Sequence, residues 1–277
     1  MALPETWPRS VPLLSVRTSS EVASKMEIIA VIPARFASTR LPGKPLLSET
    51  GRPLIQHVVE AARRAKSLHR IIVATDDPRI ADVVAGFGGE PMMTRADHAT
   101  GTDRVAEVAA RIEQAGIIVN VQGDEPEIAG STVDRLVSLL DSDRDAPMAT
   151  LATPIRDPAI YRDPSCVKVV CSRRDRALYF SRSPIPFHRD GLPDPAASTP
   201  VAHLHLGLYA YRREFVLSIS SLPRSALEAA EKLEQLRVLE AGHPIAIGIV
   251  DEPSIGIDTP EDYRRFVDRF RKSQGGG

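Results

Sequence analysis

The stretch IIAVIPAR at residues 28–35, followed by STRLPGKP at residues 38–45, decides the fold class of this chain. Its apolar run is typical of a buried β-strand, and the loop behind it carries three cations, Arg35, Arg40 and Lys44. Open α/β sheets bind ligands outside the carboxyl ends of their strands, and closely spaced cations favour a polyanion. The stretch therefore predicts an α/β sheet with a polyanion site, for which a nucleoside triphosphate is the first candidate.

The cationic loop lacks both common phosphate-binding motifs. Pro45 stands where a P-loop would have Ser or Thr after its lysine, and the loop contains no Gly-x-Gly-x-x-Gly. An ordinary P-loop kinase or a dinucleotide dehydrogenase is therefore disfavoured.

Charge and composition narrow the class of protein. The 277 residues contain 35 Lys and Arg against 36 Asp and Glu, so no net charge attracts nucleic acid or acidic lipid. No apolar run approaches the roughly 20 residues of a membrane helix, and two cysteines are too few for a disulfide framework. We expect a cytoplasmic protein without nucleic-acid or membrane partners.

Residues 1–25 differ from the rest of the chain. They are rich in Ser, Pro and Thr, and Met26 directly precedes the first expected strand. The segment is predicted to be a disordered N-terminal extension or the product of an upstream start codon. Glu5 and Glu21 disfavour a transit peptide.

Short apolar runs alternate with helical patterns along residues 26–277, as in βαβ units. The predicted fold is α/β: a doubly wound, mostly parallel sheet in a single domain, with an antiparallel insertion at about residues 160–205, where prolines interrupt the pattern. The run at residues 117–121 is apolar on both faces apart from Asn120, which predicts a central strand. Other strands are expected near residues 28–32, 71–74, 148–153, 205–211 and 245–250, and helices near residues 53–66, 78–87, 101–114, 131–140, 226–241 and 260–272.

Two aspartates follow expected strands and should face the cationic loop. Asp124 lies in QGDEP at residues 122–126, and Asp258 lies in GIDTPED at residues 256–262. Mg²⁺ needs few carboxylates besides waters and substrate phosphates, so these two would suffice. Asp258 is equally well explained as the start of a helix before Pro260.

Three other stretches are candidate binding elements. TRADHATGTDR at residues 94–104 is more polar than a helix or strand requires, and Gly101 permits close approach to a base or sugar. A binding loop is favoured there, although Thr102 or Asp103 could cap the following helix. Alternation at residues 203–211 places a polar stripe suited to a carbohydrate on one strand face: His203, His205, Gly207, Tyr209 and Tyr211. One side of the helix expected at residues 226–241, mostly solvated by this interpretation, carries Glu228, Glu231, Glu234 and Gln235.

In this order, the motifs resemble those of the 3-deoxy-manno-octulosonate (Kdo) cytidylyltransferase family, over about residues 26–272. The cationic loop resembles the CTP loop of the family, and residues 94–102 resemble its second binding loop. The series continues with VQGDEP at 121–126, YFSR at 179–182, HLG at 205–207, LEQLR at 233–237 and DTPED at 258–262.

The resemblance implies a Rossmann-like nucleotidyltransferase fold and the reaction of CTP and Kdo to CMP-Kdo and diphosphate, for lipopolysaccharide biosynthesis. It also implies a homodimer and a Mg²⁺ cofactor held by Asp124 and Asp258, with Lys44 and Arg35 as further catalytic residues. CTP binding is expected from Pro33, Ala34, Arg35, Arg40, Lys44, Thr100, Gly101 and Thr102. Sugar binding is expected from Arg95, Gln122, His205, Tyr209, Glu234 and Gln235.

Two rival functions remain open at this point. The chain could activate another acidic sugar, such as a sialic acid or an amino analogue of Kdo. It could also be a non-catalytic nucleotide-sugar sensor, although a sensor would not need two metal carboxylates beside a triphosphate loop.

Overall fold

The apolar run that opens the sequence forms β1 (Glu27–Ala34), in the middle of a mixed sheet. The computed structural model describes residues 26–37, 41–189, 202–251 and 255–274; residues 1–25, predicted to be disordered, lie outside this part. Within it, β1 pairs in parallel with β2 (Arg70–Thr75) on one side and β4 (Ala115–Asn120) on the other. Its residues 29–32 are fully buried, as expected for a strand covered on both faces.

Seven of the nine strands of the described chain lie in the order β3-β2-β1-β4-β8-β5-β9; β6 pairs with β8, and β7 pairs with β6. Of all nine, seven point the same way, and only β7 and β8 run against this direction. The α/β class and the mostly parallel sheet are confirmed. The other strands are β3 (Glu90–Met93), β5 (Met148–Pro154), β6 (Lys168–Cys171), β7 (Ala177–Ser181), β8 (His203–Arg212) and β9 (Ile245–Ile249).

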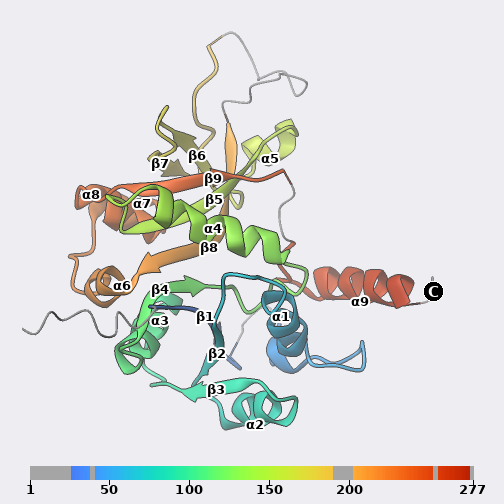
Figure 1. Ribbon diagram of the computed structural model, residues 1–277. Coiled ribbons are helices and arrows are strands. Elements are labelled where there is room, and N and C mark those ends of the chain that lie inside the picture. The colour runs from blue at the N-terminus through green and yellow to red at the C-terminus, as the bar shows by residue number, and fades with distance from the viewer. Residues whose placement is uncertain (1–25, 38–40, 190–201, 252–254, 275–277) are drawn as a thin grey trace, which may run out of the picture.

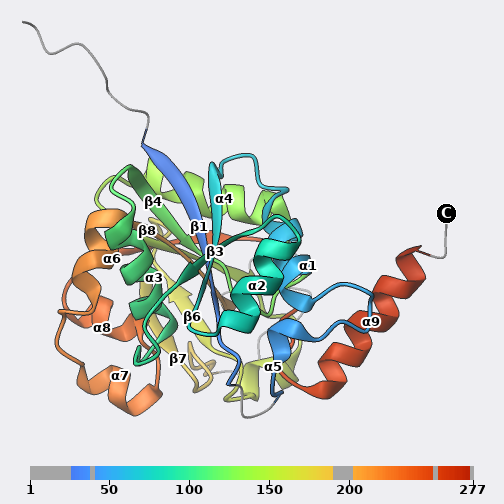
Figure 2. The same cartoon turned by 90° about the horizontal axis from the view of Figure 1, so that it is seen from below.

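Helices cover both faces of the sheet, so the fold is doubly wound (Figure 1, Figure 2). One core lies under α1 (Leu54–Ala62), α2 (Pro78–Gly86) and α4 (Gly130–Ser142). The other lies under α3 (Gly101–Arg111), α6 (Arg213–Ile219) and α8 (Gln235–Glu240). None of the described helices is long and apolar enough to cross a membrane.

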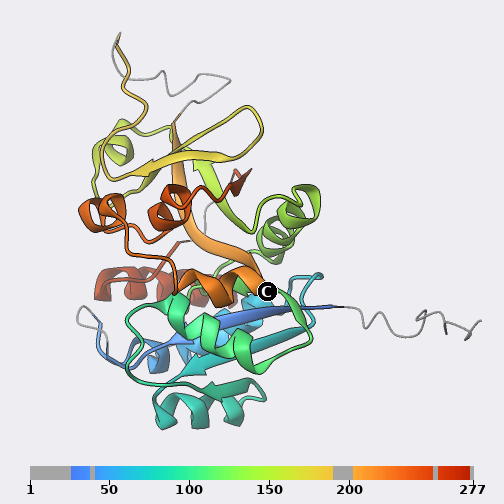
Figure 3. The ribbon, with the colours of Figure 1, turned by 90° about the vertical axis from the view of Figure 1, so that its left-hand side faces the viewer.

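The predicted antiparallel insertion is present as a hairpin of β6 and β7, preceded by α5 (Pro158–Arg162). Figure 3 shows it in yellow, beyond the sheet of the first half of the chain. Lys168 anchors its base: the fully buried ammonium donates hydrogen bonds to the carbonyls of Asp163, Cys166 and Arg182, at 2.5–2.8 Å. Three carbonyl acceptors compensate for burial of this charge.

The last helix, α9 (Pro260–Gln274), returns to the first half of the chain (Figure 1). Tyr263, Phe266 and Val267 pack with Leu41 and Leu54 in a small separate cluster. Because these partners flank the turn η1 (Lys44–Leu46), α9 supports the cationic loop from outside.

One predicted helix is wrong. The pattern at residues 226–241 is divided into α7 (Ala226–Glu231) and α8, because Lys232 adopts a left-handed conformation with φ 55°. The sequence gives no warning, since glycine is the residue that usually takes this conformation. Four short elements of the described chain were not predicted: β3, α5, α6 and the turn η1.

Candidate active site

Lys44, Asp124 and Asp258 meet at the carboxyl edge of the sheet, as predicted. Lys44 Nζ lies 2.8 Å from Asp124 Oδ2 and 3.6 Å from Asp258 Oδ1. It also donates a 2.7 Å hydrogen bond to the carbonyl of Ile257. The Lys44 side chain is only 14% exposed, whereas those of Asp124 and Asp258 are 28% and 51% exposed. One nearly buried ammonium thus holds two carboxylates that reach solvent.

The ends of two neighbouring strands bring these groups together. Asp124 follows β4, and Gly123 before it has no room for a side chain: a Cβ there would lie 2.7 Å from the carbonyl oxygen of Pro33 in β1. The Asp124 carbonyl accepts a 2.9 Å bond from Ile257 N–H, which fixes the approach of the Asp258 segment. Close backbone packing therefore sets the positions of both carboxylates.

The alternative role of Asp258 as a helix cap is taken by its neighbours. Thr259 Oγ accepts from Asp262 N–H at 3.2 Å, and the Asp262 carboxylate accepts from Thr259 N–H at 2.9 Å. This reciprocal pair satisfies the start of α9. Asp258 is left with its carboxylate toward Lys44, which favours the functional interpretation.

The donor set at this point suits Mg²⁺. The carboxylates of Asp124 and Asp258 both face the Lys44 ammonium. Mg²⁺ usually binds one or two protein carboxylates and completes its coordination with water and substrate phosphates. Among the described residues, no group of three or more His, Cys, Asp or Glu could form a complete protein cage.

Arg35 joins the cationic loop to the second binding loop. Its Nη2 donates to the carbonyls of His98 and Thr100, at 2.8 and 3.2 Å. On the other side of the loop, Glu107 of α3 accepts from the ring of His98 and, at 3.0 Å, from the backbone N–H of Arg95. Burial raises the pKa of Glu107, but these donors outweigh it and hold that pKa below its usual value. The loop is thus fixed from both sides.

Thr100 and Thr102 have separate roles at the start of α3. Thr100 is the N-cap and forms a capping box with Asp103, so the capping alternative holds for Asp103 but is wrong for Thr102. Thr102 is buried and donates a 2.8 Å hydrogen bond to Glu234. Gly101 between them leaves the space near Pro33 open, since a Cβ would make only an ordinary 3.9 Å contact.

The polar stripe of β8 contains an irregularity that shapes it. Thr150 of β5 pairs with Tyr209 and the next residue, Leu151, with Leu206, so two residues of β8 bulge out at Gly207. Thr150 Oγ donates across the bulge to the carbonyl of Leu208 at 2.6 Å, and Gln122 donates to the carbonyl of Gly207 at 2.7 Å. The bulge thus links β8 to the segment that carries Asp124.

Burial keeps the stripe uncharged. It lowers the pKa of His205 to about 3, and it raises the pKa values of Tyr209 and Tyr211 above their usual range. The His205 and Tyr209 rings lie 5.4 Å apart, and His205 Nε2 is 3.1 Å from Thr150 Oγ. His205 and both tyrosines therefore offer neutral hydrogen-bonding groups near neutral pH.

The acids at residues 228–234 have different partners. Glu228 pairs with Arg237 at 2.6 Å, and Glu231 accepts from Arg182 N–H at 2.9 Å. Glu234, beyond the break at Lys232, turns to Thr102 instead. The prediction that these acids share a mostly solvated helix side is wrong, because the helix ends between them. The adjacent Gln235 is also buried.

Two predicted site residues are not brought into this group. The guanidinium of Arg95 is 67% exposed and pairs with Asp97 at 3.0 Å, not with any other predicted sugar-binding residue that the structure describes. Arg40 lies outside the described residues.

Arg104 and Asp76 form a buried pair that the sequence analysis missed. Arg104 is fully buried on α3, and its Nη2 lies 3.2 Å from Asp76 Oδ1 at the end of β2. Another of its nitrogens donates to Thr94, at the entry to the second binding loop. In the sequence TGTDR, Arg104 is typical of a solvated helix residue. Only the unusual polarity of the stretch at residues 94–104 could have indicated that one of its side chains has a buried role.

Comparisons with known proteins show the family to which the chain belongs. The family model described as cytidylyltransferase matches residues 29–247. The chain is 54% identical to the 3-deoxy-manno-octulosonate cytidylyltransferase of Syntrophotalea carbinolica, over 89% of this chain and 99% of the relative. The corresponding protein of Syntrophobacter fumaroxidans is 52% identical, over 87% and 96%.

A solved structure gives the same answer for the fold. The structure of CMP:2-keto-3-deoxy-manno-octonic acid synthetase in complex with CTP superposes with a TM-score of 0.83, at 44% identity, over 89% of this chain and 99% of the other. With relatives this similar over nearly their whole length, the chain belongs to the 3-deoxy-manno-octulosonate cytidylyltransferase family.

Proposed function

We propose that this chain transfers CMP from CTP to Kdo, giving CMP-Kdo and diphosphate. The observation that carries the proposal is the Lys44 ammonium between Asp124 and Asp258, beside a loop bound by Arg35. Relatives at 47–54% identity bear the name of this activity.

The chemical difficulty of the reaction is charge. The anomeric hydroxyl of the sugar attacks the α-phosphorus, and the bond from that phosphorus to the bridging oxygen breaks as diphosphate leaves. Lys44 and Arg35 bring positive charge to the triphosphate, and positioned charges of this kind stabilise the transition state strongly. Lys44 already has a fixed direction, because Asp124 and the Ile257 carbonyl hold its ammonium.

Asp124 and Asp258 would hold the Mg²⁺ ion. When bound, the ion would neutralise phosphate charge and orient the reacting groups. Lys44 Nζ lies 2.8 Å from the Asp124 carboxylate and 3.6 Å from that of Asp258, so both carboxylates face a common point at which an ion could bind.

The neutral stripe of β8 would receive the sugar. His205 and Tyr209 offer hydrogen-bonding groups without charge, Gln122 links them to the Asp124 segment, and Glu234 can accept from sugar hydroxyls. Arg95, expected to meet the sugar, has a largely exposed side chain that pairs with Asp97, so we do not assign it to the sugar carboxylate.

The test is a product assay with a matrix of substrates. The protein is mixed with Mg²⁺, each of the four nucleoside triphosphates, and either Kdo, amino-Kdo or sialic acid, and the products are identified by mass. We expect CMP-Kdo and diphosphate from CTP and Kdo. CMP-sialic acid or CMP-amino-Kdo as the main product would favour the alternative acidic sugar, and binding without turnover would favour a sensor.

We further propose that the protein works as a homodimer in the cytoplasm, where CTP is available, and supplies activated Kdo for lipopolysaccharide. Analytical ultracentrifugation tests the first point. A sedimentation mass of one chain at micromolar concentration would contradict it.

A further inference from the structure

The break between α7 and α8 gives Glu234 a position unlike that of its neighbouring acids. Lys232 takes a left-handed conformation, which is unfavourable for a residue with a Cβ. Beyond it, the chain turns so that Glu234 meets α3. In an unbroken helix Glu234 would share a side with Glu231, whose carboxylate instead accepts from Ser181 and Arg182.

A hydrogen bond from the buried Thr102 joins this turn to the nucleotide side of the site. Thr102 Oγ donates to Glu234 Oε2 at 2.8 Å, across 132 residues of sequence. Thr102 is only 6% exposed, and it follows Thr100 and Gly101 directly in the loop that Arg35 holds. The predicted CTP-binding loop and a predicted sugar-binding carboxylate therefore share one buried contact.

The surroundings of Glu234 make this contact important for its charge. Burial raises the pKa of Glu234, and Asp103 of α3 acts in the same direction. The hydroxyls of Thr102 and Thr100 oppose this, as does Arg237 of α8, while Tyr209 and Tyr211 of β8 face Glu234 as neutral groups. The Thr102 hydroxyl is thus one of the few groups that favour the ionised carboxylate.

A small hollow lies beside the bond between Thr102 and Glu234. A cavity of about 20 Å³ lies between Thr102, Glu234, Tyr211 and Met148. This is room for one water molecule. Without the hydroxyl of Thr102, the carboxylate could turn or take up a proton.

We propose that Thr102 is a positioning residue that couples the two substrate subsites, an inference that rests on the proposed function. CTP bound to the loop at residues 98–102 fixes Thr102, and Thr102 then holds the Glu234 carboxylate ready to accept from hydroxyls of the acidic sugar. Coupling of this kind is reciprocal, so the sugar must strengthen CTP binding by the same factor.

Binding measurements with α,β-methylene-CTP, which cannot release diphosphate, test the coupling. The affinity for this analogue is measured by calorimetry with Mg²⁺, in the absence and the presence of saturating Kdo, for the wild type and Thr102→Val. We expect the Kdo-dependent gain in affinity to fall about tenfold in the variant, as for loss of a hydrogen bond to a charged group. The affinity for the analogue alone is the reference from which the gain is calculated for each protein, so an effect of the substitution on CTP binding itself does not enter the comparison.

Two variants separate positioning from general structural damage. Thr102→Ser restores the hydroxyl and should recover the gain, whereas Thr132→Val, at another buried threonine on α4, should leave it unchanged. The inference would be overturned if Thr102→Val showed the same Kdo-dependent gain in affinity as the wild type, or if Thr102→Ser did not recover that gain. Failure of the wild type to form CMP-Kdo in the product assay would instead overturn the proposed function.

Discussion

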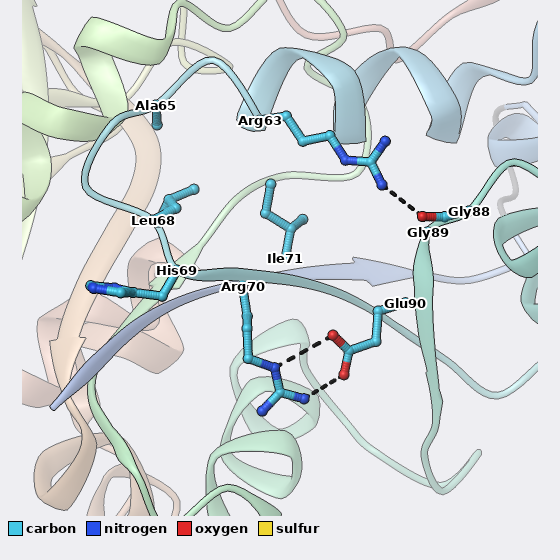
Figure 4. Close-up of a pocket in the computed structure, with 9 residues that line it drawn as sticks. All are labelled: Arg63, Ala65, Leu68, His69, Arg70, Ile71, Gly88, Gly89 and Glu90. Atoms are coloured by element: carbon cyan, nitrogen blue, oxygen red, sulfur yellow. Dashed lines mark hydrogen bonds and ion pairs between the residues drawn. The ribbon is translucent and has the colours of Figure 1, made fainter. Parts of the chain in front are cut away.

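At the amino edge of the sheet, an Arg70 side chain that is 35% exposed pairs with Glu90 and Glu27, whereas at the carboxyl edge the Lys44 side chain, only 14% exposed, faces Asp124 and Asp258. Both edges have charged side chains around a hollow or loop. Figure 4 shows the amino-edge pocket, of about 350 Å³, with Arg70 bonded to Glu90 and Arg63 to the Gly88 carbonyl. Its dashed contacts join groups from neighbouring elements within the fold.

The difference shows what marks a reaction site in this molecule. At the amino edge, the Arg70 side chain is 35% exposed and meets its carboxylates at the starts of adjacent strands, so water and these partners satisfy the charges. At the carboxyl edge, the same ratio of one cation to two carboxylates is held by backbone packing between distant segments around an ammonium that is nearly buried, which costs free energy unless a ligand completes the group. Burial of the cation between distant segments is therefore a better guide to the site here than a charged hollow by itself.

The largest expected effect is that of Asp124→Asn. The variant removes one of the two carboxylates proposed to hold Mg²⁺ while keeping the side-chain shape. We expect kcat/KM to fall by about a thousandfold or more, since loss of such a group costs several kcal/mol of transition-state stabilisation. Diphosphate release is measured on protein shown to be folded. Glu90→Gln at the amino edge is the matched control and should stay within twofold; a loss below tenfold in Asp124→Asn would remove the distinction between the edges.

Lys44→Met is expected to have the next largest effect. It should lower kcat/KM for CTP about a hundredfold, because a charge fixed beside the triphosphate is lost. Without the ammonium, the two carboxylates repel each other, so Mg²⁺ alone should stabilise the variant against heat more than it stabilises the wild type. Melting temperatures with and without Mg²⁺ check this. Equal Mg²⁺ shifts in the two proteins would argue that the carboxylates do not share the ion.

Glu228→Gln tests stability beside the carboxyl-edge site. The hydrogen bond from Arg237 holds the pKa of Glu228 below its usual value, and both side chains are almost buried. The pair therefore stabilises the fold above the ordinary glutamate pKa, near 4.5, and this contribution is lost as the pH falls through the lower folded value. We expect a loss of about 3 kcal/mol at pH 7 that shrinks towards pH 3. Urea unfolding over this range checks it; a loss independent of pH would point to packing instead.

Arg70→Ala should have the smallest effect. Its partners at the amino edge are more than a third exposed, and ion pairs of this kind contribute about 0–1 kcal/mol. We expect turnover within twofold of the wild type and a small change in urea midpoint. A tenfold loss of activity would mean that the amino edge takes part in the reaction.

The sequence was sufficient for the parts of the site that follow strands. Lys44, Asp124 and Asp258 could be placed together because parallel strands end at one edge, and the apolar runs at residues 28–32 and 117–121 mark those strands. The grouping of Glu234 with Thr102 could not be predicted. It depends on a left-handed lysine, which no residue preference indicates, and on tertiary contacts between α3 and the α7–α8 turn.

The exposure of Arg95 and Arg104 also could not be predicted from the sequence. Both lie in one polar stretch, yet Arg95 is exposed and Arg104 is fully buried against Asp76. The local sequence does not indicate which of the two arginines is buried. Only the packing of α3 against β2 decides which guanidinium is taken into the fold.

Binding of Mn²⁺, followed by electron paramagnetic resonance in place of Mg²⁺, tests the central claim most directly. In the presence of α,β-methylene-CTP, the wild type and Glu90→Gln should bind one Mn²⁺ ion per chain with the same affinity. Asp124→Asn and Asp258→Asn should each weaken it at least tenfold. Unchanged Mn²⁺ binding in both carboxyl-edge variants, or its loss in Glu90→Gln, would contradict a metal and triphosphate site formed by Lys44, Asp124 and Asp258.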